Sequence, residues 1–184
     1  MPFDIKSIRA KANELLQDSA SLSAPVSPER IAKSLGIEVL SKPAEDELCG
    51  FLYRGSENEK TIIGVNANHH PNRRRFTVAH EIGHYVLHNY QGFHFDSENQ
   101  KYLLKLRKKS NRTNPVEERE ANTFAAELLM PKDLIDRDML ENQNADLLFG
   151  NELPKLARKY QVSVRALTYR LINLGHIESD KEFA

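Results

Sequence analysis

The sequence predicts an α+β fold that is mostly helical, with a small antiparallel sheet and a helix-turn-helix-like hairpin near the C-terminus. Several long stretches repeat apolar residues at helical spacing and carry capping residues at their ends. Short segments rich in β-branched and large apolar residues lie between residues 37 and 65. We expect one main domain over residues 1–140, followed by a C-terminal helical segment over residues 141–184.

The first part of the chain is expected to form two helices and then the sheet. Asp4 can cap the first helix, and Ser27 with Pro28 can open a second helix that ends at Gly36. The last two strands flank a polar turn and therefore predict a hairpin. An exposed edge of such a sheet can bind an extended peptide. The expected strands are Ile37–Leu40, Leu48–Arg54 and Lys60–Val65.

A third helix, expected over Arg74–His88, carries an H-E-x-x-H motif. His80 and His84 are four residues apart, so both imidazoles project from one helix face and can hold one metal ion. Glu81 points about 100° away, where its carboxylate can act as a general base on a water molecule at the metal. The competing interpretation is a core helix whose histidines hydrogen-bond to neighbours.

A catalytic zinc site needs a third protein ligand. A helix expected over Pro115–Pro131 places Glu118 on its apolar face, and Glu120 is the alternative ligand. Asn122 shares the face of Glu118 and can orient a ligand histidine. His88 lies one further turn along the motif helix, and we interpret it as a packed histidine in preference to a partner of a ligand. The competing interpretation makes the glutamates ordinary charges of the first helical turns.

Two basic stretches remain outside this motif. The segment 91–114 is rich in lysine and arginine and predicts a solvated loop or helix face in preference to a lid. The C-terminal segment predicts a helix over Leu153–Tyr160, a tight turn, and a second helix that Ser163 caps and Gly175 ends. We prefer a docked helical hairpin to a DNA-binding one, although five cations favour DNA contact: Lys155, Arg158, Lys159, Arg165 and Arg170.

Composition excludes several classes of protein. The formal net charge of the 184 residues is zero, which provides no overall field for nucleic acid or membrane surfaces. Cys49 is the single cysteine, which agrees with a reducing compartment. The sequence has neither a secretory signal at its start nor an apolar run long enough to span a bilayer. We therefore expect a soluble cytoplasmic protein.

The runs R-R-F-T-V-A-H-E-I-G-H-Y-V-L-H and E-R-E-A-N-T-F-A-A-E-L-L-M-P resemble the ImmA/IrrE family of zinc metallopeptidases. The resemblance covers most of the chain and implies a zincin-like, gluzincin-like core. It implies that His80, His84 and Glu118 bind Zn²⁺ and that Glu81 is the catalytic base. It also implies that the substrate is a helix-turn-helix transcriptional repressor of the XRE type, whose removal switches on mobile-element or stress genes.

Two functional hypotheses from different classes follow. The first is a site-specific zinc endopeptidase, in which the group that stabilises the oxyanion is one of Tyr53, Tyr85, Tyr90, His88 and His94. The alternative is a regulator that binds DNA or a partner protein and keeps the peptidase fold without proteolysis. Metal-dependent hydrolysis of a substrate other than a peptide is a third possibility, because a ligand set alone does not define the substrate.

Overall fold

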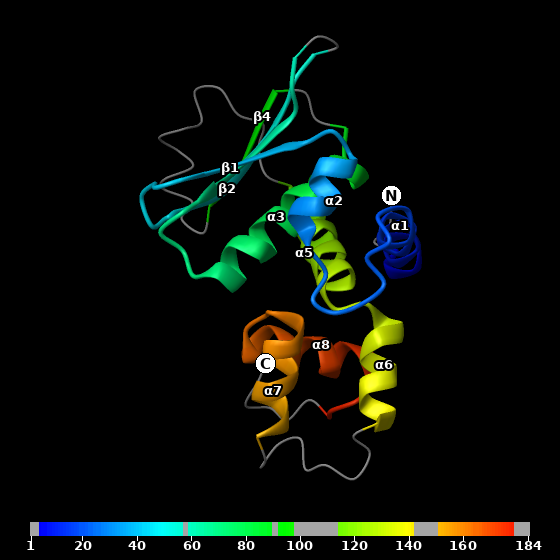
Figure 1. Cartoon of the computed structure of the whole chain (residues 1–184). Coiled ribbons are helices and arrows are strands. Elements are labelled where there is room, and N and C mark those ends of the chain that lie inside the picture. Colours follow the sequence, from blue (N-terminus) through cyan, green and yellow to red (C-terminus); the bar gives the residue numbers. More distant parts are fainter. Residues whose placement is uncertain (1–3, 57–58, 90–91, 98–113, 142–150, 179–184) are drawn as a thin grey trace.

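The computed structural model describes residues 4–56, 59–89, 92–97, 114–141 and 151–178 (Figure 1). The sheet lies at one end of the molecule, α3 and α5 cross beneath it, and α6 to α8 form the other end. In chain order the elements are α1 (Ile5–Asp18), α2 (Pro28–Ser34), β1 (Glu38–Lys42), β2 (Leu48–Arg54), β3 (Ile62–Asn66), α3 (Pro71–Leu87), β4 (Gly92–Ser97), α5 (Pro115–Leu129), α6 (Lys132–Glu141), α7 (Glu152–Tyr160) and α8 (Val164–Leu174).

The capping residues begin and end the helices where the sequence predicts. The side chains of Asp4, Ser27 and Ser163 accept hydrogen bonds from backbone amides in the first turns of α1, α2 and α8. Gly36 and Gly175 have φ values of +75° and +80° after α2 and α8, which is the left-handed geometry of a helix end. The sequence did not predict α6, which begins directly after Pro131.

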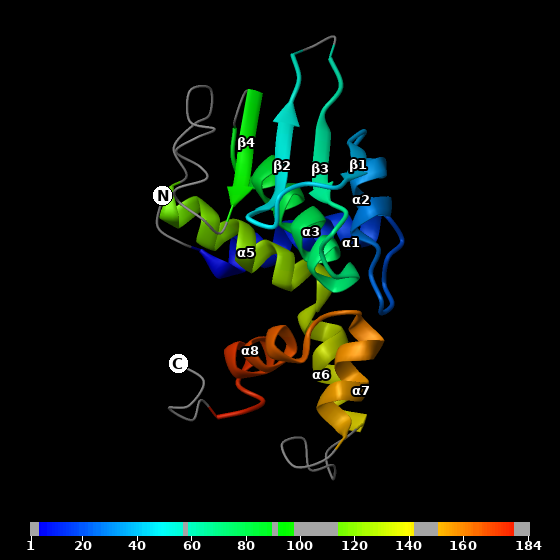
Figure 2. The same ribbon diagram turned by 90° about the vertical axis from the view of Figure 1, so that its left-hand side faces the viewer.

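The sheet is mixed, which corrects the prediction of an antiparallel sheet. Among the described residues its strand order is β1-β3-β2-β4 (Figure 2). The predicted hairpin is confirmed, because β2 and β3 pair antiparallel. However, β3 pairs in parallel with β1, with Glu38 opposite Ile62. After β1 the chain crosses to the position of β2 and leaves a gap beside β1. Strand β3, the second strand of the hairpin, then fills this gap between β1 and β2.

Strand β4 corrects the prediction for the start of the segment 91–114. Residues Gly92–Ser97 pair antiparallel with β2 and form one edge of the sheet. The alternation of Phe93 and Phe95 with polar residues indicates a strand, but the basic run that follows obscured it. That run, from Lys101 to Arg112, lies outside the described residues.

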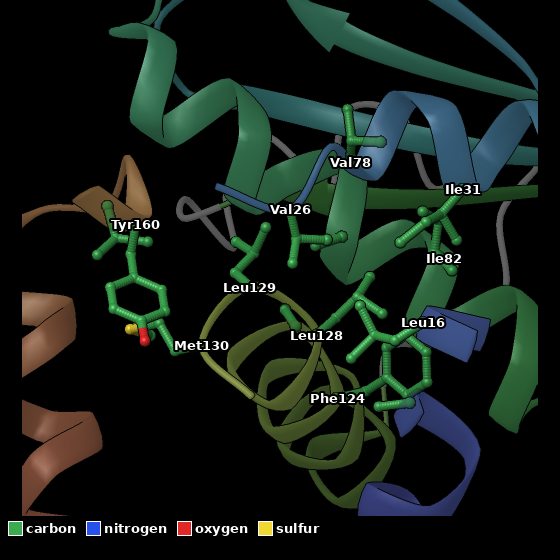
Figure 3. Close-up of a cluster of buried hydrophobic side chains, with 14 of the residues drawn as sticks. Leu16, Val26, Ile31, Val78, Ile82, Phe124, Leu128, Leu129, Met130 and Tyr160 are labelled. Atoms are coloured by element: carbon green, nitrogen blue, oxygen red, sulfur yellow. The ribbon is translucent and has the colours of Figure 1, made fainter. Parts of the chain in front are cut away.

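Helices α3 and α5 form the centre of the molecule and pack closely at Gly83. A Cβ atom added to Gly83 would lie 3.1 Å from the Cα atom of Ala121 and 3.2 Å from the Cβ atom of Phe124. Helix α5 therefore packs directly on this turn of α3. Phe124, Leu128 and Ile82 belong to the apolar cluster between these helices, α1 and α2 (Figure 3).

The C-terminal helices are joined to this core by buried polar contacts. The Arg170 guanidinium donates to the Glu127 carboxylate at 2.6 and 2.9 Å and to the Met130 carbonyl at 3.0 Å. Tyr160, which lies against Met130 in Figure 3, donates its hydroxyl to Asp138 at 2.9 Å. The position of α8 relative to α5 is thus fixed by directional bonds as well as by apolar packing. None of the described helices is long and apolar enough to cross a membrane.

Candidate metal centre

Two histidines of α3 and one glutamate of α5 converge on one point. The Nε2 atoms of His80 and His84 lie 2.9 Å apart. The Glu118 carboxylate lies 3.3 Å from the first nitrogen and 3.5 Å from the second. Tetrahedral zinc with bonds of about 2.0–2.1 Å spaces its ligand atoms about 3.3 Å apart. The donor set and its spacing therefore fit a divalent ion such as zinc.

The other ring nitrogens of the two histidines are held by hydrogen bonds that favour metal binding. His80 Nδ1 lies 3.1 Å from Asn122 Oδ1, an acceptor, so this nitrogen carries the proton and Nε2 keeps its lone pair. His84 Nδ1 lies 3.0 Å from His88 Nδ1, and His88 Nε2 lies 3.0 Å from Glu120. When His84 Nδ1 donates to His88 and His88 donates to Glu120, the lone pair of His84 Nε2 also points at the shared site.

Glu120 is therefore not placed with the converging donor atoms, and its contact is with His88. The expectation that His88 is merely a packed histidine is wrong, because it bonds both to His84 and to Glu120. The sequence contained an indication of this pairing. His84 and His88 are four residues apart on one helix, and such neighbours share a face.

Glu81 of α3 and His94 of β4 complete the cluster. Both side chains are buried, and Glu81 Oε2 lies 3.8 Å from His94 Nδ1. His94 Nε2 lies 3.3 Å from Glu118 Oε1, and its ring centroid lies 4.0 Å from that of His84, with the ring planes tilted by 40°. The edge strand thus delivers one imidazole between the two carboxylates of the cluster.

The electrostatics of the cluster separate the histidines into neutral and cationic groups. Burial lowers the pKa of His84 to about 3, so its ring is neutral near pH 7 and its lone pair is available. Burial also opposes protonation of His94, but the neighbouring Glu118 and Glu81 carboxylates outweigh it and raise the pKa of His94 to about 10. Burial raises the pKa of Glu118, yet its bonds to His80, His84 and His94 hold it far below the ordinary range.

The candidates for oxyanion stabilisation lie in different places, and only some of them are near the converging Nε2 atoms. The Tyr53 hydroxyl donates to Glu59 at 2.9 Å, and the Tyr85 ring lies against the Arg54 guanidinium. His88 lies behind His84, on the side away from the converging Nε2 atoms. His94 lies beside Glu81 and Glu118. Tyr90 lies outside the described residues.

Three of the five cations of the C-terminal segment have acidic partners. Arg170 is buried against Glu127, so it is not available to DNA. Lys159 bonds to Asp138 at 2.5 Å and Lys155 bonds to Glu152 at 2.6 Å, and both lysines remain exposed, as do Arg158 and Arg165. The carboxylates beside the two lysines reduce the positive charge of this surface, which weakens the case for DNA binding by α7 and α8.

A histidine pair and a glutamate on adjacent helices, with a buried glutamate beside them, are an arrangement suited to metal-dependent hydrolysis. Residues 32–172 match the family described as the IrrE N-terminal-like domain, a peptidase family. The chain therefore belongs to the ImmA/IrrE family of metallopeptidases.

The curated relatives carry names that agree with this family. The radiation response metalloprotease IrrE of Deinococcus radiodurans is 29% identical over 88% of this chain and 46% of its own length. The IrrE protein of Deinococcus deserti is 34% identical over 61% of this chain and 36% of its own length. The uncharacterized immunity region protein 2 of Bacillus phage phi105 is 34% identical over 56% of this chain and 58% of its length. The chain thus spans about half or less of the two IrrE proteins.

A solved structure has a similar fold. The protein described as a Mycobacterium tuberculosis transcriptional regulator superposes with a TM-score of 0.59 at 15% identity. The match covers 91% of this chain and 46% of that one. The arrangement of helices and sheet is therefore shared with a longer protein.

Proposed function

We propose that this chain is a zinc-dependent endopeptidase with a zincin-like core, in which His80, His84 and Glu118 bind the ion. The observation that carries the proposal is the convergence of two Nε2 atoms and one carboxylate, with the opposite ring nitrogens bonded to Asn122 and His88. The family membership and the names of the IrrE relatives support proteolysis. The segment 141–184 is then a helical appendage of the peptidase domain.

The roles of the residues follow from their positions. A bound zinc ion supplies Lewis-acid polarisation of the scissile carbonyl and acidifies water in the site. The Glu81 carboxylate takes the proton of the attacking water and passes it to the leaving amine. His94 lies 3.8 Å from the Glu81 carboxylate on the β4 side and can donate a hydrogen bond where negative charge develops on the carbonyl oxygen.

We propose that the substrate lies extended along β4 and is an XRE-type repressor. Strand β4 is paired only on its β2 side within the described sheet, so its other edge has backbone groups available to an extended peptide. The name of the phage relative, an immunity region protein, supports a role in mobile-element regulation. The test is incubation with the repressor encoded nearest the gene, followed by mass spectrometry; a repressor that stays intact would contradict this substrate.

Replacement of Glu118 by alanine is expected to abolish stoichiometric zinc binding, whereas Glu120→Ala keeps one zinc per chain. The reason is that Glu118 faces both Nε2 atoms, while Glu120 contacts His88. Metal analysis of the two purified variants after dialysis measures the difference. Equal zinc content in the Glu118 variant and the wild type would refute the ligand assignment.

Replacement of His88 by alanine is expected to weaken zinc binding about 10- to 100-fold without removing a ligand. The variant loses the acceptor that holds the His84 Nδ1 proton, so the ring is free to rotate and change tautomer. Competition with a zinc chelator measures the affinity, and His176→Ala, which removes an imidazole that contacts Asp136 away from the cluster, is the control. A His88 variant that binds zinc as tightly as the control would show that the contact has no positioning role.

A further inference from the structure

A recess lies near the metal centre, on the side of the C-terminal helices. It has a volume of about 690 Å³ and lies between the first half of α3, the middle of α5 and the start of α8. Figures 1 and 2 show α3 and α8 facing one another at this place. Sites for small ligands and peptide side chains have volumes of about 300–1,000 Å³, so the recess has room for several side chains.

Two residues lie between the recess and the metal centre. Phe76 and Asn122 line the recess, and both lie beside His80. The Asn122 oxygen lies 3.1 Å from His80 Nδ1, and the Phe76 ring centroid lies 6.3 Å from that of His80. A chain segment that fills the recess therefore lies beside the residues that hold His80 in place.

Two arginines line the recess, and its described lining residues include no aspartate or glutamate. Arg73 of α3 donates to Cys49 Sγ at 3.1 Å, at the inner wall. The Arg165 guanidinium of α8 lies 5.5 Å from the centre of the Tyr169 ring, beside an aromatic surface that is 40% exposed. Apolar surface comes chiefly from Phe76, Val162 and Ala166, and the rest of the lining is mostly polar and uncharged. The recess thus combines an apolar wall with two arginines from different elements.

We propose that this recess binds an acidic segment of the protein substrate, with a carboxylate of the substrate on Arg165 at the rim. The proposal rests on the proposed function in one respect, that the substrate is a polypeptide. Arginine pairs well with carboxylates, and the apolar wall accepts a neighbouring aliphatic or aromatic side chain.

A peptide fits these observations better than a nucleic acid. The recess is concave and offers two arginines, whereas a duplex is bound by an array of cations along its phosphates. Among the neighbouring cations, Arg170 is buried against Glu127, and the exposed Lys155 and Lys159 each lie beside a carboxylate. The site is also next to a cluster suited to peptide hydrolysis.

The test uses the full chain carrying Glu81→Gln, loaded with zinc and immobilised, as bait for a phage library of random dodecapeptides. Three baits are compared: the single variant, the same protein with Arg165→Glu, and the same protein with Arg158→Glu. Arg158 is exposed on α7 and does not line the recess, so it is the matched charge reversal. Circular dichroism melting of each bait establishes that it is folded.

We expect the peptides selected by the first and third baits to be enriched in aspartate and glutamate. A selected peptide is expected to bind the Arg165→Glu bait about tenfold more weakly in fluorescence anisotropy, because one charge-assisted hydrogen bond is lost. Selection without acidic enrichment, equal losses at Arg158 and Arg165, or displacement of the peptide by a short DNA duplex at lower concentration would each overturn the proposal.

A second measurement separates this proposal from the proposed function. The selected peptides are incubated with the zinc-loaded wild-type chain, and cleavage is followed by mass spectrometry. Binding that depends on Arg165 without cleavage supports the recess and contradicts proteolysis of these sequences. Cleavage that is insensitive to peptide charge and to Arg165→Glu supports the peptidase and contradicts the recess.

Discussion

Replacing Glu81 with glutamine is expected to lower the rate of substrate cleavage by about 10²- to 10⁴-fold while zinc content stays unchanged. The amide has nearly the same volume as the carboxylate, so the fully buried position next to Ile82 and His80 keeps its packing. It cannot accept a proton from water at neutral pH. Initial rates of cleavage of the intact repressor measure the loss, and metal analysis measures the zinc content.

The control for Glu81→Gln is Glu14→Gln, which makes the same chemical change at an exposed position on α1. The control is expected to cleave at the wild-type rate. The two hypotheses for the chain differ here. A regulator that works by binding alone would keep its function in the Glu81 variant, so full regulatory activity in that variant would reject proteolysis as the mechanism.

Replacing Arg170 with methionine is expected to lower the free energy of unfolding by about 3–5 kcal/mol. Its partner, Glu127, has 1% of its side chain exposed, and removal of Arg170 leaves that carboxylate with Arg9 as its remaining cation in this buried contact. The Met130 carbonyl also loses its donor. Urea denaturation followed by circular dichroism measures the change, and Arg158→Met, at an exposed position, is expected to lie within about 0.5 kcal/mol of wild type.

The pH dependence gives an independent check on the Arg170 prediction. Burial raises the pKa of Glu127, but hydrogen bonds from Arg170 and Arg9 outweigh it and lower the pKa below its ordinary value. A depressed carboxylate pKa stabilises the folded state above the unfolded pKa, and this stabilisation is lost as pH falls through the folded pKa. The deficit of Arg170→Met should therefore shrink in acid. A deficit that is constant with pH would indicate lost packing instead of a lost ion pair.

Local patterns in the sequence were sufficient for most helices and for the donor atoms of the site. Capping residues such as Asp4 and Ser163 act on amides two or three residues away, so the sequence alone predicts where they begin a helix. Helical spacing likewise places His80 and His84 on one face, and the apolar stripe of α5 turns Glu118 toward them. The caps and the histidine pair depend on groups within one or two helical turns, and the apolar face of each helix indicates which side chains point toward the other helix.

The features that the sequence did not predict depend on contacts between distant residues. Arg170 was grouped with the surface cations of the C-terminal segment, yet its partner lies 43 residues earlier in the chain. The parallel pairing of β1 with β3 depends on where the hairpin is inserted, which strand propensity does not specify. His94 is brought to Glu81 by strand pairing of β4 with β2, so its place in the site could not be inferred from spacing along the chain.

The central claim is that one zinc ion is bound where α3 meets α5, and anomalous X-ray scattering at the zinc edge tests it most directly. Crystals of the zinc-loaded chain are expected to give one strong peak at about 2.0–2.2 Å from His80 Nε2, His84 Nε2 and a Glu118 carboxylate oxygen. The peak should be absent in Glu118→Ala crystals. A peak centred on His88 and Glu120, or zinc-loaded crystals with no peak at the three converging groups, would contradict the account.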